Sequence, residues 1–153
     1  MSKEVQILGQ ERINAMLREM SDIDRNKSIK AGIRKGVILL RQGGIKRLKA
    51  RMKNPEGVTG NLLKAFQVKV KKNKLGGLAG FGMIMAKDGE KIRANHAYIV
   101  DLGTTGRTRS SGGSTGSMPE LHFWTDTRNE DIDRALDAVL KGTEQAIMRI
   151  MNR

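Results

Sequence analysis

The sequence contains no cysteine, only two prolines and two histidines, and few aromatic residues. Without cysteine, disulfides and thiolate chemistry are excluded, and a metal ion would have to be held by histidine and carboxylate ligands. The two histidines, His96 and His122, are far apart in the chain, and no pair of carboxylates at metal-ligand spacing lies near them. A protein metal site needs three or four converging ligands, so we expect no metal site and no cofactor.

Long apolar runs are also missing. No segment approaches the roughly 18 consecutive apolar residues of a membrane-spanning helix, and no apolar stretch follows a basic N-terminal start. We therefore expect neither a membrane span nor a secretory signal. With 153 residues, the chain is expected to form one domain, residues 1–153, around one hydrophobic core.

Acidic residues are almost absent from one third of the chain. Residues 25–74 contain sixteen Lys or Arg and a single acid, Glu56, whereas the net charge of the whole chain is +13. Such a concentration of cations predicts a docking face for nucleic acid, an acidic membrane or an acidic protein, and composition does not choose among them. We assign this docking face to Lys30, Arg34, Lys35, Arg41, Arg47, Lys69 and Lys71.

Three segments have the apolar periodicity of amphipathic helices, at residues 10–20, 25–51 and 130–151. In the longest segment, Gly32 and Gly36 lie one turn apart, which lets a neighbouring backbone approach closely. We favour packing inside the protomer over a contact between subunits. The adjacent glycines at 43 and 44 suggest a kink. For the third helix, we expect Thr127 or Asn129 to act as the N-cap.

Residues 66–71 alternate between apolar and polar side chains, as in a half-buried strand. We expect further strands at residues 79–86, 91–95 and 98–102, with an Asp-Gly hairpin turn between the first two of these. The predicted fold class is α+β: an antiparallel sheet of about four strands packed against the long basic helix and the C-terminal helix, with a long Gly/Ser-rich arm.

That arm is residues 105–118, in which eleven of fourteen residues are Gly, Ser or Thr. It has almost no apolar surface to offset its ordering entropy, so we expect a flexible arm that becomes ordered against a partner. The expected anchors are the strand before the arm and the Pro119 segment after it. The residues assigned to the arm and its anchors are Tyr98, Gly103, Thr104, Arg107, Arg109, Pro119, Phe123 and Trp124.

Enzymatic chemistry finds little support. A Ser-His-Asp set could be assembled on paper from Ser110 or Ser111 with His96 and Asp101. Nothing marks a nucleophile elbow, however, and a flexible Gly/Ser run would not hold a reacting oxygen in place. Phosphate-loop patterns are missing, and no acids cluster near the basic face to bind Mg²⁺. We therefore expect a protein that is not an enzyme.

Residues 96–104, HAYIVDLGT, resemble the Y-A-x-hydrophobic-V-acidic-hydrophobic-G-T signature of the tail-completion, or head-to-tail joining, proteins of tailed bacteriophages. In that family the signature is followed by a loop and a Pro-x-x-x-Phe segment, and Pro119 with Phe123 stand in the corresponding places. The family's Pro-x-x-x-Thr-Gly-x-Leu element is matched by residues 55–62. These elements occur in the same order as in the family and together span roughly residues 25–152.

The resemblance implies a structural virion protein that is made in the host cytoplasm and located in the neck or tail. It implies a subunit of a six-fold or twelve-fold ring at the head–tail junction, next to an adaptor or stopper ring and a tail terminator or tail tube. The basic face would then meet those rings or the DNA in the channel. We favour protein, because a strongly cationic bore would grip DNA that must move. The alternative is a small basic, non-enzymatic DNA-binding protein.

Overall fold

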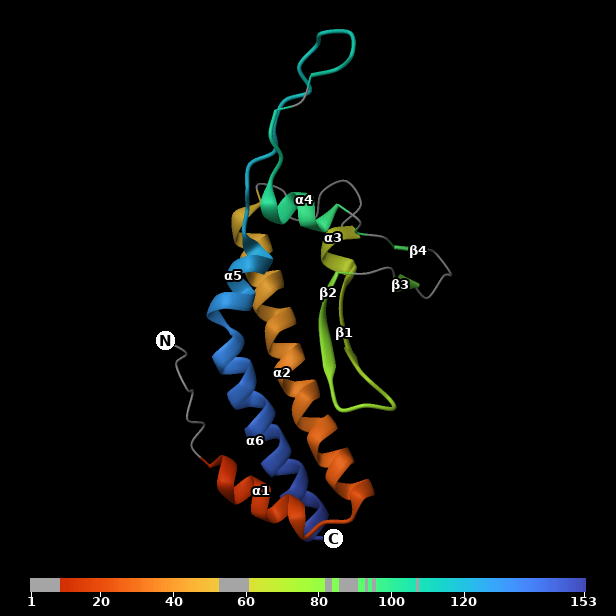
Figure 1. The fold of residues 1–153 in the computed structure, drawn as a ribbon, viewed down its shortest axis with the longest axis vertical. Helices are drawn as coiled ribbons and strands as arrows, with labels where there is room; N and C mark the ends of the chain where they lie inside the picture. Colours follow the sequence, from red (N-terminus) through yellow and green to blue (C-terminus); the bar gives the residue numbers. More distant parts are fainter. Residues whose placement is uncertain are drawn as a thin grey trace. The chain divides into compact units, whose positions relative to one another are not determined.

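The chain divides into two compact units in the computed structural model (Figure 1). Among the residues that the structure describes, unit 1 contains those in the ranges 9–39, 68–78 and 133–153. Unit 2 contains those in the ranges 40–67 and 79–132. The structure describes residues 9–52, 61–81, 84–85, 91–92, 94, 96–106 and 108–153.

Helices dominate the described residues. The helices are α1 (Gln10–Arg18), α2 (Asp22–Arg51), α3 (Asn61–Lys64), α4 (Ala97–Leu102), α5 (Phe123–Glu130) and α6 (Ile132–Met151). The strands are β1 (Phe66–Val70), β2 (Gly77–Phe81), β3 (Ile84–Met85) and β4 (Lys91–Ile92). The strands form two separate pairs, β1 with β2 and β3 with β4. In the second pair Ile84 lies opposite Ile92 in antiparallel register.

The predicted sheet of about four strands is therefore wrong, and the fold is mostly helical and only loosely α+β. The main error lies at residues 98–102, which form α4 instead of a strand. Ala97, Val100 and Asp101 are buried there, whereas Tyr98 is 65% exposed. Burial at positions i, i+3 and i+4 is the period of a helix. The Asp-Gly turn expected near residue 88 lies outside the described residues.

The predicted C-terminal helix is preceded by a second, shorter helix. α5 ends at Glu130 and α6 begins at Ile132, with the buried Asp131 between them. Thr127, expected as an N-cap, lies inside α5, where its hydroxyl donates to the carbonyl of Phe123 at 2.6 Å. The prediction of a cap at Thr127 is therefore wrong, because its hydroxyl closes a turn of the preceding helix.

In unit 1, α2 packs closely against α6 through glycines. A Cβ atom added at Gly32 would overlap the hydroxyl of Thr143 and the carbonyl of Val139, and one at Gly36 would overlap the Val139 side chain. The predicted close packing inside the protomer is confirmed. On β2, Gly77 meets Ile33 and Val37 of α2 in the same way.

α2 continues as a helix through Gly43 and Gly44, where the sequence suggested a kink. Both glycines make room for side chains of unit 2. A Cβ atom at Gly43 would overlap the carboxylate of Asp131, and one at Gly44 would overlap the ring of Phe66. These glycines therefore serve side-chain packing, which explains why the helix tolerates their low helix propensity.

The core of unit 2 contains a cluster of aromatic rings. Phe66 contacts Phe81 and Trp124 edge-on, with ring centroids 4.4 and 5.1 Å apart, and Phe81 contacts Phe123 at 5.4 Å. These are four of the five aromatic residues of the chain. Phe123 also packs with Leu48 of α2 in the buried core. The core therefore holds the first turn of α5 and the C-terminal part of α2 together.

Among the helices that the structure describes, none is both long and apolar enough to span a bilayer.

Candidate functional site

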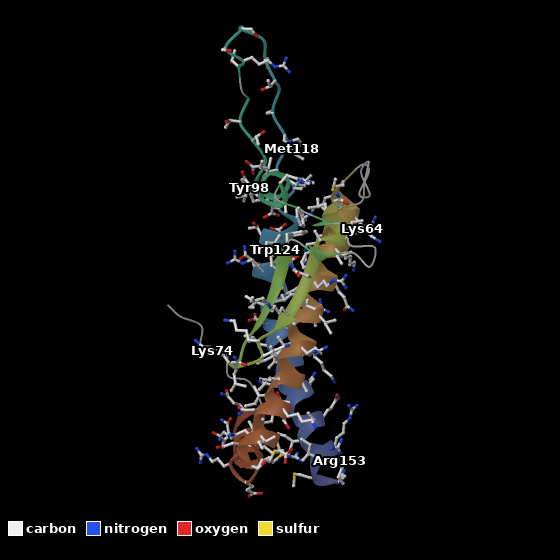
Figure 2. The ribbon with its side chains drawn as sticks, turned by 90° about the vertical axis from the view of Figure 1, so that its right-hand side faces the viewer. Lys64, Lys74, Tyr98, Met118, Trp124 and Arg153 are labelled. Carbon is white, nitrogen blue, oxygen red and sulfur yellow. The ribbon has the colours of Figure 1, made fainter. Side chains whose placement is uncertain are left out.

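The arm, residues 105–118, leaves unit 2 as two adjacent legs (Figures 1 and 2). Near its tip, the backbone N–H of Arg109 donates to the carbonyl of Gly113 at 2.8 Å, and Thr108 pairs with Ser114 in antiparallel register. Every described residue from 105 to 117 is exposed. The arm is thus a narrow antiparallel ladder whose side chains face solvent. Arg107 lies outside the described residues.

The two legs are joined at their base. The N–H of Thr104 donates to the carbonyl of Met118 at 2.9 Å, and the N–H of Met118 donates to the hydroxyl of Thr104 at 3.0 Å. Gly103 has a φ of 70°, which favours glycine. A Cβ atom at Gly103 would also lie 2.7 Å from the carbonyl of Met118. Pro119, which follows this junction, is exposed.

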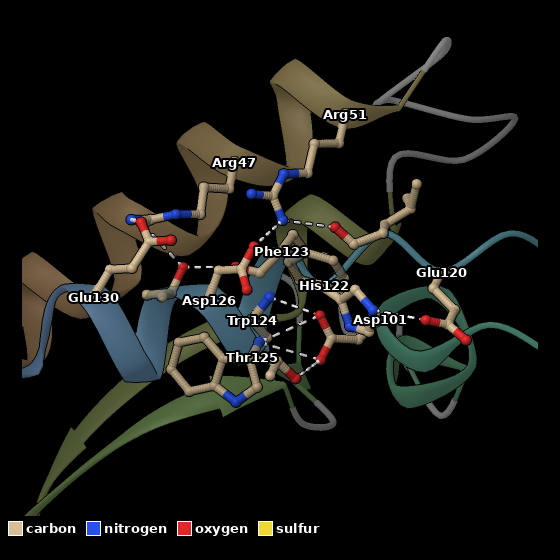
Figure 3. A network of polar contacts seen from close by, with 12 residues as sticks. Arg47, Arg51, Asp101, Glu120, His122, Phe123, Trp124, Thr125, Asp126 and Glu130 are labelled. Atoms are coloured by element: carbon tan, nitrogen blue, oxygen red, sulfur yellow. Dashed lines mark hydrogen bonds and ion pairs between the residues drawn. The ribbon is translucent and has the colours of Figure 1, made fainter.

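Asp101 ties the chain before the arm to the chain after it (Figure 3). Its main-chain carbonyl accepts the N–H groups of Leu121 and His122 at 3.2 and 2.8 Å. Its buried carboxylate accepts the N–H of Trp124 at 2.7 Å and the hydroxyl of Thr125 at 2.6 Å. A carboxylate suits this position, since it satisfies free amides at the start of α5 and complements the helix dipole. We call Asp101 with these partners the clamp.

Two arginines of α2 hold α5 from its other side (Figure 3). Arg51 contacts the carboxylate of Asp126 at 2.6 Å and donates to the carbonyl of Leu121 at 2.7 Å. Arg47 contacts Asp131 at 2.5 Å and Glu130 at 2.6 Å. The hydrogen bonds to Asp131 and then Glu130 raise the pKa of Arg47. The position of α5 beneath the arm is thus set by α2.

A mostly apolar pocket of about 540 Å³ opens beside the base of the arm. Tyr98 and Leu102 of α4 line it and are 65% and 54% exposed. Phe81 and Trp124 line it as well, and Arg128 of α5 adds a positive charge. The sequence had pointed to Tyr98 and Trp124 as anchors of the arm. Leu102 and Arg128 were missed, because only the helical form of residues 97–102 brings them to the same pocket.

A second hollow, of about 420 Å³, lies in unit 1 and is strongly basic. Lysines and an arginine from α2 form one wall, and lysines that follow β1 form the other. The ammonium of Lys30 donates to the carbonyl of Lys72 at 2.5 Å and joins the two walls. We call this the basic hollow; its lining residues are Lys27, Lys30, Ala31, Arg34, Val70, Lys71 and Lys72.

The residues of the predicted docking face belong to both units. Lys30, Arg34 and Lys71 meet in the basic hollow, and Lys69 is exposed on β1. Like Lys30, the other three contact their own chain: Lys35 donates to Gln145, Arg41 donates to the carbonyl of Phe66 at 2.9 Å, and Arg47 binds acids of α5 and the α5–α6 junction. Lys27 and Lys72, which the prediction did not include, line the hollow.

The serines and the aspartate that were considered for a catalytic set lie in different surroundings. Ser110 and Ser111 lie exposed at the arm tip, whereas Asp101 is buried against α5. The ring of His122 contacts the carboxylate of Glu120 at 2.7 Å. No group of three or more potential metal ligands occurs within the part of the chain that the structure describes.

Compared with models of protein families, curated proteins and solved structures, this chain finds no match.

Proposed function

We propose that this chain is a structural subunit of an oligomeric ring at the neck of a tailed phage, where it completes the tail and joins it to the head. The observation that carries the proposal is an arm whose described residues from 105 to 117 are all exposed, held at its base by the clamp around the buried Asp101. The residues that resemble the tail-completion signature contribute to this base: Asp101, Gly103 and Thr104 precede the arm, and Pro119 and Phe123 follow it.

A closed ring needs two different surfaces on each subunit, one that projects and one that receives. The arm is the projecting surface. Its exposed residues bury little apolar area in their own chain, and ordering a backbone costs roughly 1–2 kcal/mol per residue. A neighbouring subunit that covers the arm would offset this cost. The polar ladder can pair with a partner through backbone groups and the charge of Arg109.

The receiving surface is the apolar pocket beside α4, and its occupant is a second copy of this chain. Asp101 and Leu102, which line the pocket, lie next to the Thr104–Met118 junction at the base of the arm, so a neighbouring subunit that contacts the arm is brought close to the pocket. Tyr98 and Leu102 leave large apolar areas in water, and each would be covered in such a contact. Arg128 at this pocket offers a charge for an acidic residue of the neighbour.

The test compares the mass of the full-length protein with that of an arm-shortened variant. In the variant, residues 106–116 are replaced by Asn-Gly, a two-residue turn that lets the Thr104–Met118 pairing close. We expect the full-length protein to form a closed oligomer in native mass spectrometry and the variant to stay monomeric with the same thermal stability. Leu102→Asp, which keeps the arm, should weaken the oligomer as well.

Location is tested in particles of the phage that encodes the chain. Antibody labelling seen by electron microscopy should mark the junction between head and tail. A full-length protein that stays monomeric at every concentration, together with virions that lack the polypeptide, would overturn the proposal.

A further inference from the structure

We propose that the basic hollow of unit 1 binds the phosphate backbone of a nucleic acid without reading its bases. The inference goes beyond the ring proposal, since no residue of the arm, the clamp or the apolar pocket contributes to the hollow.

The hollow brings cations together from two parts of the chain. Lys27, Lys30 and Arg34 follow one another at spacings of three and four residues, which places them on one face of α2. Lys71 and Lys72 come from the turn after β1 and form the opposite wall. A hydrogen bond from the ammonium of Lys30 to the carbonyl of Lys72 joins the two walls.

The chain neutralises other cations of α2 but not these. Arg47 and Arg51 each contact a carboxylate of the α5 region within 2.6 Å. In contrast, none of the described residues that line the basic hollow is a carboxylate, although five of them are positively charged. Like charges at this density repel one another, and an external anion relieves that repulsion. The difference separates cations that are paired with carboxylates from cations whose charge has no carboxylate among the described lining residues.

The chemistry of the lining favours phosphates of a nucleic acid backbone. An arginine fork with several ammonium groups suits the oxygens of successive phosphates. Only Ala31 and Val70 are apolar, which gives no surface to insert into a lipid layer. Among the described lining residues there is no aromatic side chain on which a base could stack. Binding should therefore follow backbone charge and show little sequence preference.

The experiment measures the affinity of the full-length protein for a fluorescent 20-base-pair duplex DNA by anisotropy at several NaCl concentrations. Each phosphate that the protein neutralises contributes about −0.9 to the slope of log K against log salt concentration. Lys71→Glu and, as a milder change, Arg34→Gln should each weaken binding several-fold and reduce the slope by about one. A duplex of scrambled sequence should bind equally well. A parallel measurement with double-stranded RNA compares DNA and RNA as sources of phosphate.

The matched control is Lys141→Glu. Lys141 is an exposed lysine of α6 in the same unit and is not among the lining residues of the hollow. Lys141→Glu changes the net charge by the same amount as Lys71→Glu. We expect it to leave the salt slope close to that of the wild type. Circular dichroism melting curves check that all three variants are folded. If Lys71→Glu does not fold, Arg34→Gln alone decides the result.

Equal weakening by Lys71→Glu and Lys141→Glu would overturn the inference, because it would show a response to net charge alone. Displacement of the DNA by poly-L-glutamate as effectively as by unlabelled DNA of equal charge would overturn it in favour of an acidic protein ligand. The arm-shortened variant keeps the result apart from the ring proposal. As a monomer, it should retain the salt slope per chain even where ring formation fails.

Discussion

Asp101 accepts hydrogen bonds from four residues that follow the arm. Its carbonyl accepts from Leu121 and His122, and its carboxylate accepts from Trp124 and Thr125. Replacing it with asparagine removes the charge at the start of α5 and turns an N–H group towards the donors of Trp124 and Thr125. We expect Asp101→Asn to lower the free energy of unfolding by about 1–2 kcal/mol, as measured by urea denaturation.

The control for this prediction is Asp137→Asn, which makes the same chemical change at an exposed position of α6. It should stay within about 0.5 kcal/mol of the wild type, as surface substitutions generally do. Equal stability of the two variants would show that the clamp does not hold the base of the arm.

Arg47 is the second residue whose surroundings set its role. Its side chain is 19% exposed and contacts the carboxylate of Asp131, which is 6% exposed. Arg47→Met removes the charge-assisted hydrogen bonds of the guanidinium to that carboxylate, so we expect a loss of roughly 1.5–3 kcal/mol of unfolding free energy. The double variant Arg47→Met with Asp131→Asn should lose less than the sum of the two single changes. Lys46→Met, at the exposed neighbouring position, should change stability little.

At the scale of elements, the contact between α2 and α6 depends on glycine. Alanine is the better helix former by about 1 kcal/mol at an exposed site. Gly32→Ala should nevertheless destabilise the protein by roughly 1–3 kcal/mol, because its Cβ atom would overlap backbone and side chain of α6. Thermal melting checks the sign. Gly80→Ala, where a Cβ atom would meet nothing within 4 Å, is the control. A stabilised Gly32→Ala would mean that the two helices are not in close contact.

At the scale of the whole molecule, the arm offers an exposed cleavage site to trypsin, which cuts after Lys and Arg. Arg109 is exposed in a segment whose neighbours from 108 to 117 are all exposed. We expect the first cut of the free protein at the arm, seen by mass spectrometry as fragments that end near Arg109. Assembly into a ring should slow this cut while cuts elsewhere on the surface proceed as before. An arm that is cleaved equally fast in the free and assembled protein would contradict its role as the subunit contact.

Charge is likewise a property of the whole chain that the fold redistributes. The concentration of cations in residues 25–74 was visible in the sequence. Its division into structural arginines and an open hollow was not, because Asp126, Glu130 and Asp131 are distant in sequence from Arg47 and Arg51. Only folding brings opposite charges from distant segments within contact distance.

Local signals were sufficient for several elements. The period of apolar residues predicted the helix that is now α2, the alternation of residues 66–71 predicted β1, and the glycines at 32 and 36 predicted close packing inside the protomer. The composition of residues 105–118 predicted an arm without a core of its own, since Gly, Ser and Thr offer little apolar area to bury. Each of these follows from neighbours in the chain.

Tertiary contacts decided the rest. Tyr98, Val100 and Leu102 alternate as a strand would, yet residues 97–102 fold as α4, because that helix buries Ala97, Val100 and Asp101 together. A stretch of five or six residues fits either period, and the choice depends on what packs against it. In the same way, the sequence determined by itself that one region is cationic and one segment cannot bury itself. Which cations stay open, and where the arm is held, depended on side chains that only the folded chain brings together.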